Sequence, residues 1–93
     1  MHLRIVVLSK VEARAPDLWE IARRLERRGR YDYVEPFSRL SLKELEDYDE
    51  AEFVVATYEW SGKRLRLLGP GLLVPKEPKR REYREALVFD AHI

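Results

Sequence analysis

Residues 3–8 read Leu-Arg-Ile-Val-Val-Leu, and this stretch decides the fold class. Every position from Ile5 to Leu8 is apolar, so a strand formed here carries apolar side chains on both faces. Strands of that kind lie in the middle of a sheet that is covered above and below. We therefore expect a central strand in an α/β or α+β protein built as a two- to three-layer sandwich.

The next segment has the pattern of an amphipathic helix. Its apolar face follows helical spacing and consists of Leu18, Ile21, Ala22 and Leu25. Asp17 is expected to cap the start of this helix, with Glu20 three residues later completing a capping box. Gly29 is expected to end it, because glycine readily adopts the left-handed conformation found after helices.

A second strand and a second helix are predicted from residue 31 onward. Residues 31–37 read as a strand, and Pro36 limits that strand to the edge of a sheet or to a strand end. Ser41 and Glu44 have the spacing of a capping box, so a short helix should begin after Ser41 and end near Tyr48.

A β-hairpin is the expected structure of residues 53–68, with a two-residue turn at Ser61-Gly62. The alternation of apolar and polar residues places Tyr58 opposite Leu65 in the core. On the other face, this register brings together the polar pairs Glu59–Arg64 and Thr57–Arg66.

The end of the sequence is ambiguous. Residues 79–85 have a helical composition, whereas residues 87–93 alternate as a strand would. We expect a short helix that passes into a terminal strand near Ala86. The order β-α-β-α-β-β resembles the thioredoxin-like fold in topology alone, since its redox loop would be residues 9–16, which contain no cysteine. The resemblance implies the fold without oxidoreductase chemistry, and a terminal strand would instead favour a different sandwich.

The chain has the length and composition of a single domain spanning residues 1–93. It is 45% hydrophobic and 38% charged, which is typical of a globular protein with one core. The longest apolar runs, such as residues 5–8 and 53–56, hold four residues, far fewer than the ~18 that a bilayer span needs. The first residues read as a strand rather than a signal segment, so we expect a cytoplasmic protein without membrane contact.

The residue types that the sequence lacks exclude several kinds of site. The sequence has no Cys, which excludes disulfides, thiolate nucleophiles and cysteine-based zinc sites. It also has no Asn or Gln, and Arg outnumbers Lys thirteen to five. Few thermolabile side chains beside many charged ones are typical of proteins that work at high temperature, so we expect a thermophilic source.

The formal net charge of +1 conceals a segregation of charge along the chain. Residues 10–30 carry a net charge of +3, residues 31–59 carry −7 and residues 60–84 carry +6. The basic residues of the last segment are Lys63, Arg64, Arg66, Lys76, Lys79, Arg80, Arg81 and Arg84. Clustered cations are what phosphate-backbone recognition requires. We therefore expect a non-enzymatic protein that binds RNA or DNA through these eight residues, provided that the acidic middle segment does not neutralise them.

Two other functions stay open. A metal-dependent nuclease or toxin would need clustered carboxylates, for which Asp17, Asp47, Asp49 and Glu77 are candidates. A protein-interaction or inhibitory role, with a protein partner or a second copy and of cellular or viral origin, would use the sheet edge at residues 31–36.

No cofactor and no metal site is predicted. The turn Gly69-Pro70-Gly71 lacks the spacing of a phosphate-binding loop and the Lys-Ser/Thr that follows one. The two imidazoles, His2 and His92, could act together as bases or metal ligands if the terminal strands were neighbours. The sequence positions no third ligand beside them, so we expect both to be exposed to solvent.

Overall fold

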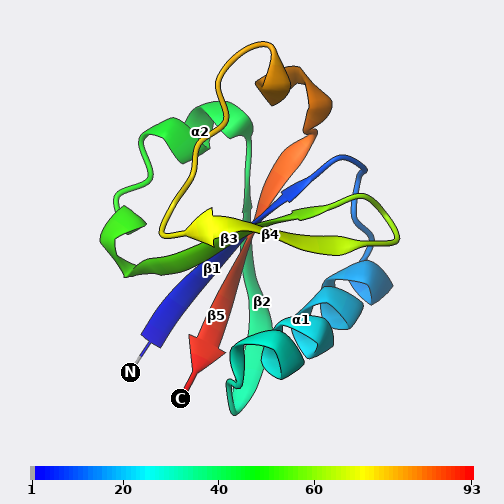
Figure 1. Cartoon of the computed structure of the whole chain (residues 1–93), viewed down its shortest axis with the longest axis vertical. Helices are drawn as coiled ribbons and strands as arrows, with labels where there is room; N and C mark the ends of the chain where they lie inside the picture. Colours follow the sequence, from blue (N-terminus) through cyan, green and yellow to red (C-terminus); the bar gives the residue numbers. More distant parts are fainter. Residues whose placement is uncertain (1) are drawn as a thin grey trace.

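The computed structural model describes residues 2–93, which form a five-stranded mixed sheet with two helices (Figure 1). In chain order the elements are β1 (His2–Ser9), α1 (Ala15–Gly29), β2 (Tyr33–Leu40), α2 (Leu42–Glu46), the 3-10 helix η1 (Ala51–Phe53), β3 (Val54–Trp60), β4 (Leu65–Pro70), the 3-10 helix η2 (Lys79–Glu82) and β5 (Glu85–His92). The strands lie in the order β2-β5-β1-β3-β4. β1 is parallel to β3, and the other neighbouring pairs are antiparallel.

The middle position of β1 confirms the prediction made from its apolar run. Ile5 and Val6 are fully buried and point to opposite faces of the sheet. Ile5 belongs to a core that includes Ile21, Ala22 and Leu25 of α1, and Val6 to a second core that includes Leu42 and Leu45 of α2. The two helices therefore cover opposite faces, as Figure 1 shows, and the protein is an α/β sandwich.

The terminal strand alters the topology that the element order suggested. The short helix and the strand expected after residue 79 are confirmed as η2 and β5. β5 lies between β1 and β2 and pairs with both, so that His92 faces His2 on one side and Tyr33 on the other. Because β5 separates β1 from β2, the thioredoxin-like arrangement is not confirmed. The terminal strand instead produces a different sandwich.

The β3–β4 hairpin forms with a longer turn than predicted. Its observed pairs are Trp60–Leu65, Glu59–Arg66 and Tyr58–Leu67, in place of the predicted Glu59–Arg64, Thr57–Arg66 and Tyr58–Leu65. The turn holds residues 61–64, and Ser61 stabilises it because its Oγ accepts a hydrogen bond from the backbone N–H of Arg64 at 3.0 Å. Tyr58 and Leu65 are nevertheless both buried, as expected.

Both ends of α1 differ slightly from the prediction. The helix begins before Asp17, whose carboxylate lies in the first turn and accepts a hydrogen bond from the Arg14 N–H at 2.9 Å. At the other end Arg30, rather than Gly29, has the left-handed conformation, with φ of 58°. Gly29 serves a different purpose, because a Cβ at this position would overlap the ring of Tyr31.

The predicted edge strand and second helix are both present, but β2 begins two residues later and ends three residues later than expected, and α2 ends at Glu46 rather than near Tyr48. β2 lies at one edge of the sheet, and its pairing with β5 is irregular between Pro36 and Ser38. α2 begins with the expected capping box, in which the Glu44 N–H donates to Ser41 Oγ at 3.0 Å and the Ser41 N–H donates to Glu44 Oε1 at 2.8 Å. Across residues 2–93, neither helix has the length and apolar character that crossing a membrane requires.

Candidate nucleic-acid interface

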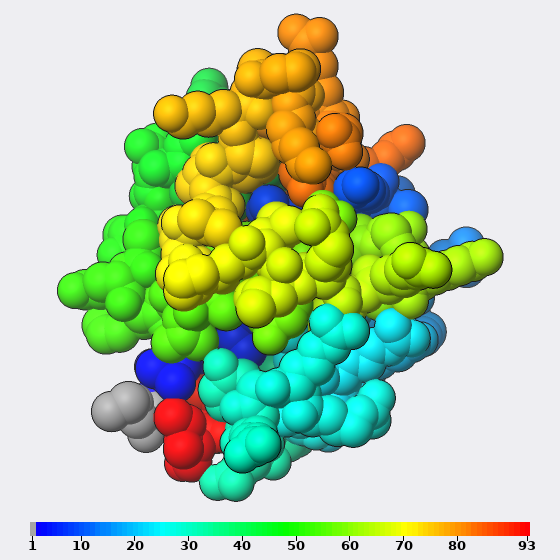
Figure 2. Space-filling model, in the orientation of Figure 1, coloured from blue at the N-terminus to red at the C-terminus, as the bar shows by residue number. Residues whose placement is uncertain are grey.

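A basic groove lies where α1 meets the β3–β4 hairpin. In the space-filling view, the hairpin (yellow-green) rests against α1 (cyan) (Figure 2). The groove has a volume of about 470 Å³ and is lined by Arg24, Arg28, Glu59, Ser61, Lys63, Arg64, Leu65 and Arg66. Five of these lining residues are cationic and one is acidic. We call this site the helix–hairpin groove.

Arg24 holds the two walls of the groove together. Its Nη1 donates a hydrogen bond to the backbone carbonyl of Lys63 at 2.9 Å, and its Nη2 lies 2.5 Å from Glu20 Oε2 on the preceding turn of α1. The guanidinium also sits 5.2 Å from the centre of the Trp60 ring. Arg24 therefore has partners within the fold, and its main effect is to fix the hairpin against the helix.

A buried carboxylate forms part of the groove wall. Glu59 is 7% exposed. Its Oε1 accepts hydrogen bonds from Arg66 Nε at 3.0 Å and Nη2 at 2.9 Å, while its Oε2 accepts one from the Tyr83 hydroxyl at 2.6 Å. Lys10 Nζ lies 3.9 Å from the same carboxylate. This arrangement satisfies the buried charge and fixes the position of Arg66.

The same contacts shift the pKa values of the two acidic partners in opposite directions. Burial raises the pKa of Glu59, but hydrogen bonds from Tyr83 and Arg66 and the charge of Lys10 outweigh it, so the net pKa lies below its ordinary value. Burial and the hydrogen bond to Glu59 raise the pKa of Tyr83 strongly. At neutral pH the pair is therefore an ionised carboxylate and a neutral phenol.

Three groove cations are free to meet an external anion. Arg28, Lys63 and Arg64 are exposed, and within residues 2–93 no ion pair involves any of them. They come from two elements that are far apart in the sequence and meet only in the fold. Arg24 and Arg28 were missing from the predicted site, although their i, i+4 spacing on α1 was a signal that they share one helix face.

The helix–hairpin groove contains three of the eight predicted residues. Lys63, Arg64 and Arg66 line the groove, whereas the five tail residues do not. Arg80 pairs with Glu46 beside α2, and Arg81 Nε lies 2.7 Å from Glu77 Oε2. The remaining tail cations, which enter no ion pair in the described part of the chain, are Lys76, Lys79 and Arg84. The acidic middle segment and local acids thus neutralise part of the predicted surface.

No family model matches this chain, and neither a curated protein nor a solved structure shows significant similarity to it.

The carboxylates considered for a nuclease are not gathered. Asp17 lies in the first turn of α1, Asp47 caps the end of α2, and Glu77 pairs with Arg81. Within residues 2–93, three side chains of the types that bind metals bring their ligand atoms within 4.8 Å of one another. None of the candidate acids for a nuclease belongs to that group. The structure therefore offers this chemistry no support at the predicted positions.

The sheet edge considered for a protein partner is present but interrupted. β2 is an edge strand and exposes Tyr33 (40%) and Phe37 (52%). Pro36 has no N–H to donate, and the pairing of β2 with β5 is irregular next to it. Natural proteins use such features to prevent one edge strand from pairing with another.

Proposed function

We propose that this protein binds nucleic acid through the phosphate backbone, using the helix–hairpin groove. The observation that supports this proposal is the meeting of cations from α1 and the hairpin around one groove, with Arg28, Lys63 and Arg64 exposed and outside any described ion pair. Long cationic side chains that converge from rigid elements suit contact with phosphate oxygens. The protein would then act as a binding protein rather than an enzyme.

The lining of the groove favours the backbone over the bases. None of the lining residues described is aromatic, and Trp60, which lies beneath Arg24, is only 1% exposed. Proteins that prefer single strands stack bases on exposed aromatic rings. We therefore expect binding that depends little on sequence and does not require single-stranded nucleic acid.

The salt dependence provides the first test. Each phosphate neutralised on a duplex contributes about −0.9 to the slope of log affinity against log salt, so three contacts give a slope of about −3. The affinity should then fall about 40-fold between roughly 50 and 200 mM salt. Fluorescence anisotropy titrations with labelled DNA and RNA duplexes measure this slope. A wild-type chain that shows no salt-sensitive binding to any of these probes would refute the proposal.

A charge-matched pair of variants locates the site. The triple variant R28A/K63A/R64A should weaken binding by about tenfold or more and reduce the slope by about three. The control K76A/K79A/R84A removes the same charge from the tail and should retain most of the affinity. The reverse result, with the tail variant impaired and the groove variant intact, would show that the tail binds instead.

Trp60 supplies an independent reporter of groove occupancy. Arg24 lies over its ring at 5.2 Å, whereas Trp19 is 47% exposed on α1. In a W19F background, Trp60 is the remaining source of tryptophan fluorescence. Adding a duplex should change that fluorescence with the same midpoint as the anisotropy signal, and an unchanged spectrum at saturation would place the ligand elsewhere.

A further inference from the structure

A polar cluster occupies the open end of the sheet, on the face that carries α2 and far from the groove. The pairing of strands aligns His2 with His92 and Arg4 with Asp90 across β1 and β5. On the other side of β5, Glu35 is aligned with Asp90. Residues two apart on a strand share a face, so these side chains form a polar layer beyond the buried core around Val6.

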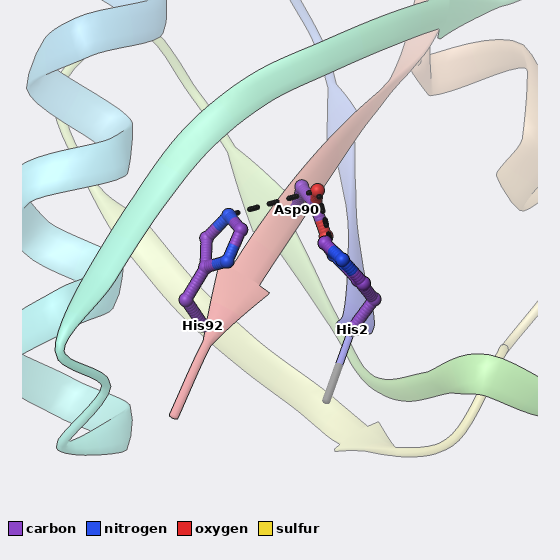
Figure 3. A group of neighbouring side chains, drawn as sticks. All are labelled: His2, Asp90 and His92. Carbon is purple, nitrogen blue, oxygen red and sulfur yellow. Dashed lines mark hydrogen bonds and ion pairs between the residues drawn. The ribbon is translucent and has the colours of Figure 1, made fainter.

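Within this layer, two imidazoles converge on one carboxylate oxygen. His2 Nδ1 lies 3.3 Å from Asp90 Oδ2, and His92 Nε2 lies 3.7 Å from the same oxygen. The ligand atoms of all three residues lie within 4.8 Å of one another. Figure 3 shows both imidazoles turned toward Asp90 from the ends of β1 and β5. The side chain of Asp90 is only 11% exposed, whereas that of His2 is 68% exposed, so the cluster opens to solvent on one side.

The neighbouring residues hold the carboxylate in place. Arg4 Nη1 donates to Asp90 Oδ1 at 2.7 Å, while His2 Nδ1 lies 3.3 Å from both oxygens of this carboxylate. Arg4 is itself near Glu50, with Nη2 and Oε1 3.6 Å apart. Glu35 Oε2 lies 2.9 Å from His92 Nε2 and adds a second negative charge beside the imidazoles. Arg4 thus acts as an outer partner that orients the Asp90 carboxylate. Glu35 instead contacts His92 Nε2, the atom that would bind a cation, so its carboxylate must move away from that nitrogen or bind the cation itself.

We propose that His2, Asp90 and His92 bind a first-row divalent cation, with Zn²⁺ as the preferred ion. In a tetrahedral zinc site with bonds of about 2.0–2.1 Å, the ligand atoms lie about 3.3 Å apart. Here Asp90 Oδ2 lies 3.3 Å from His2 Nδ1 and 3.7 Å from His92 Nε2. Two imidazole nitrogens and one carboxylate suit Zn²⁺ and its neighbours, whereas Mg²⁺ and Ca²⁺ prefer oxygen ligands alone. Water completes the coordination on the exposed side. The cation joins β1 to β5, the first and last strands of the sheet.

Zinc titration of the untagged chain tests this proposal. We expect one Zn²⁺ per chain by isothermal titration calorimetry, and Co²⁺ in its place should give the visible absorption of a four-coordinate site. Because the folded site binds and the unfolded chain has no such arrangement, a hundredfold excess of Zn²⁺ over its Kd should raise Tm by about 10 °C or more. Mg²⁺ should leave Tm unchanged. A wild-type chain that binds neither Zn²⁺ nor Co²⁺ would overturn the proposal.

Single substitutions assign the ligands. H92A and D90N should each weaken zinc affinity by more than about 100-fold. Loss of a residue that only orients a ligand weakens metal affinity by about 10- to 100-fold, so the larger effect identifies a ligand. The control D47N alters an exposed carboxylate at the end of α2 and should change the affinity less than about twofold. Circular dichroism verifies that each variant is folded. Zinc binding that survives H92A but not H2A would show chelation by the start of the chain alone, and it would contradict the proposed site.

Discussion

Replacing Phe89 with alanine is expected to lower the free energy of unfolding by about 3–5 kcal/mol, the largest effect that we predict for one substitution. Phe89 is fully buried in the core beneath α1. It lies on β5, where it faces Ile5 of β1 on one side and Pro36 of β2 on the other. Its loss leaves a cavity at the strand that joins β2 to the rest of the sheet.

Phe37 provides the matched control, because it is the same residue type on the neighbouring strand β2 but is 52% exposed. F37A loses little burial and one contact with the Arg4 guanidinium, which lies 3.9 Å from its ring centre. We expect a loss of about 1 kcal/mol or less. Urea denaturation followed by circular dichroism measures both variants. Equal losses would contradict the position of Phe89 in the buried core.

The second large effect concerns the buried carboxylate of the helix–hairpin groove. E59Q keeps the side-chain shape but removes the charge that Tyr83 and Arg66 contact at 2.6–3.0 Å. We expect a loss of about 2 kcal/mol at neutral pH, toward the middle of the range for hydrogen bonds to charged groups. The side chain of Arg66 is 59% exposed, so solvent can rehydrate it and limit the loss.

The contributions of Glu59 and Tyr83 to the free energy of unfolding should depend on pH. The pKa of Glu59 is lowered in the folded state, so its contribution is present above the unfolded value of 4.5 and is lost as the pH falls below it. The pKa of Tyr83 is raised, so its contribution is present below the unfolded value of 10.0 and is lost as the pH rises above it. Wild-type stability should therefore fall at both extremes.

Two variants separate these acid and alkaline losses. E59Q should reduce the fall below pH 4.5, where Glu44, whose pKa hydrogen bonds from Ser41 also lower, keeps part of the loss. Y83F should reduce the fall above pH 10.0. Burial also raises the pKa values of Tyr31 and Tyr48, so Y83F should still lose some stability at alkaline pH. Thermal melts from acid to alkaline pH test both expectations. Identical pH profiles for wild type and E59Q would contradict the assigned role of Glu59.

Local patterns predicted the elements of this fold better than their arrangement. The apolar run around Ile5 identified a central strand, and the Ser41–Glu44 spacing identified α2, because each depends on side chains close in sequence. The insertion of β5 between β1 and β2 depends on pairings such as His2 with His92, for which no local pattern exists. The hairpin register also escaped prediction, since it depends on a turn that Ser61 stabilises.

In the helix–hairpin groove and in the His2–Asp90–His92 cluster, too, the sequence predicted single residues better than their meeting in the fold. The basic residues of the hairpin were evident in the sequence, but their meeting with Arg24 and Arg28 required the packing of α1 against the hairpin. Asp90 was overlooked as a partner for the imidazoles. Its signal was the two-residue spacing to His92, which places both on the face opposite Leu87, Phe89 and Ala91.

The position of β5 has a consequence for synthesis on the ribosome. In the described sheet, β2 has β5 as its neighbour and no other strand, so it lacks a hydrogen-bonding partner until residues 85–92 have emerged. A nascent chain that is shorter than this exposes unpaired strand edges, which favour aggregation. Contacts between strands so distant in sequence also slow folding. Cells that express this protein should therefore rely on chaperones during its translation more than the small size of the domain suggests.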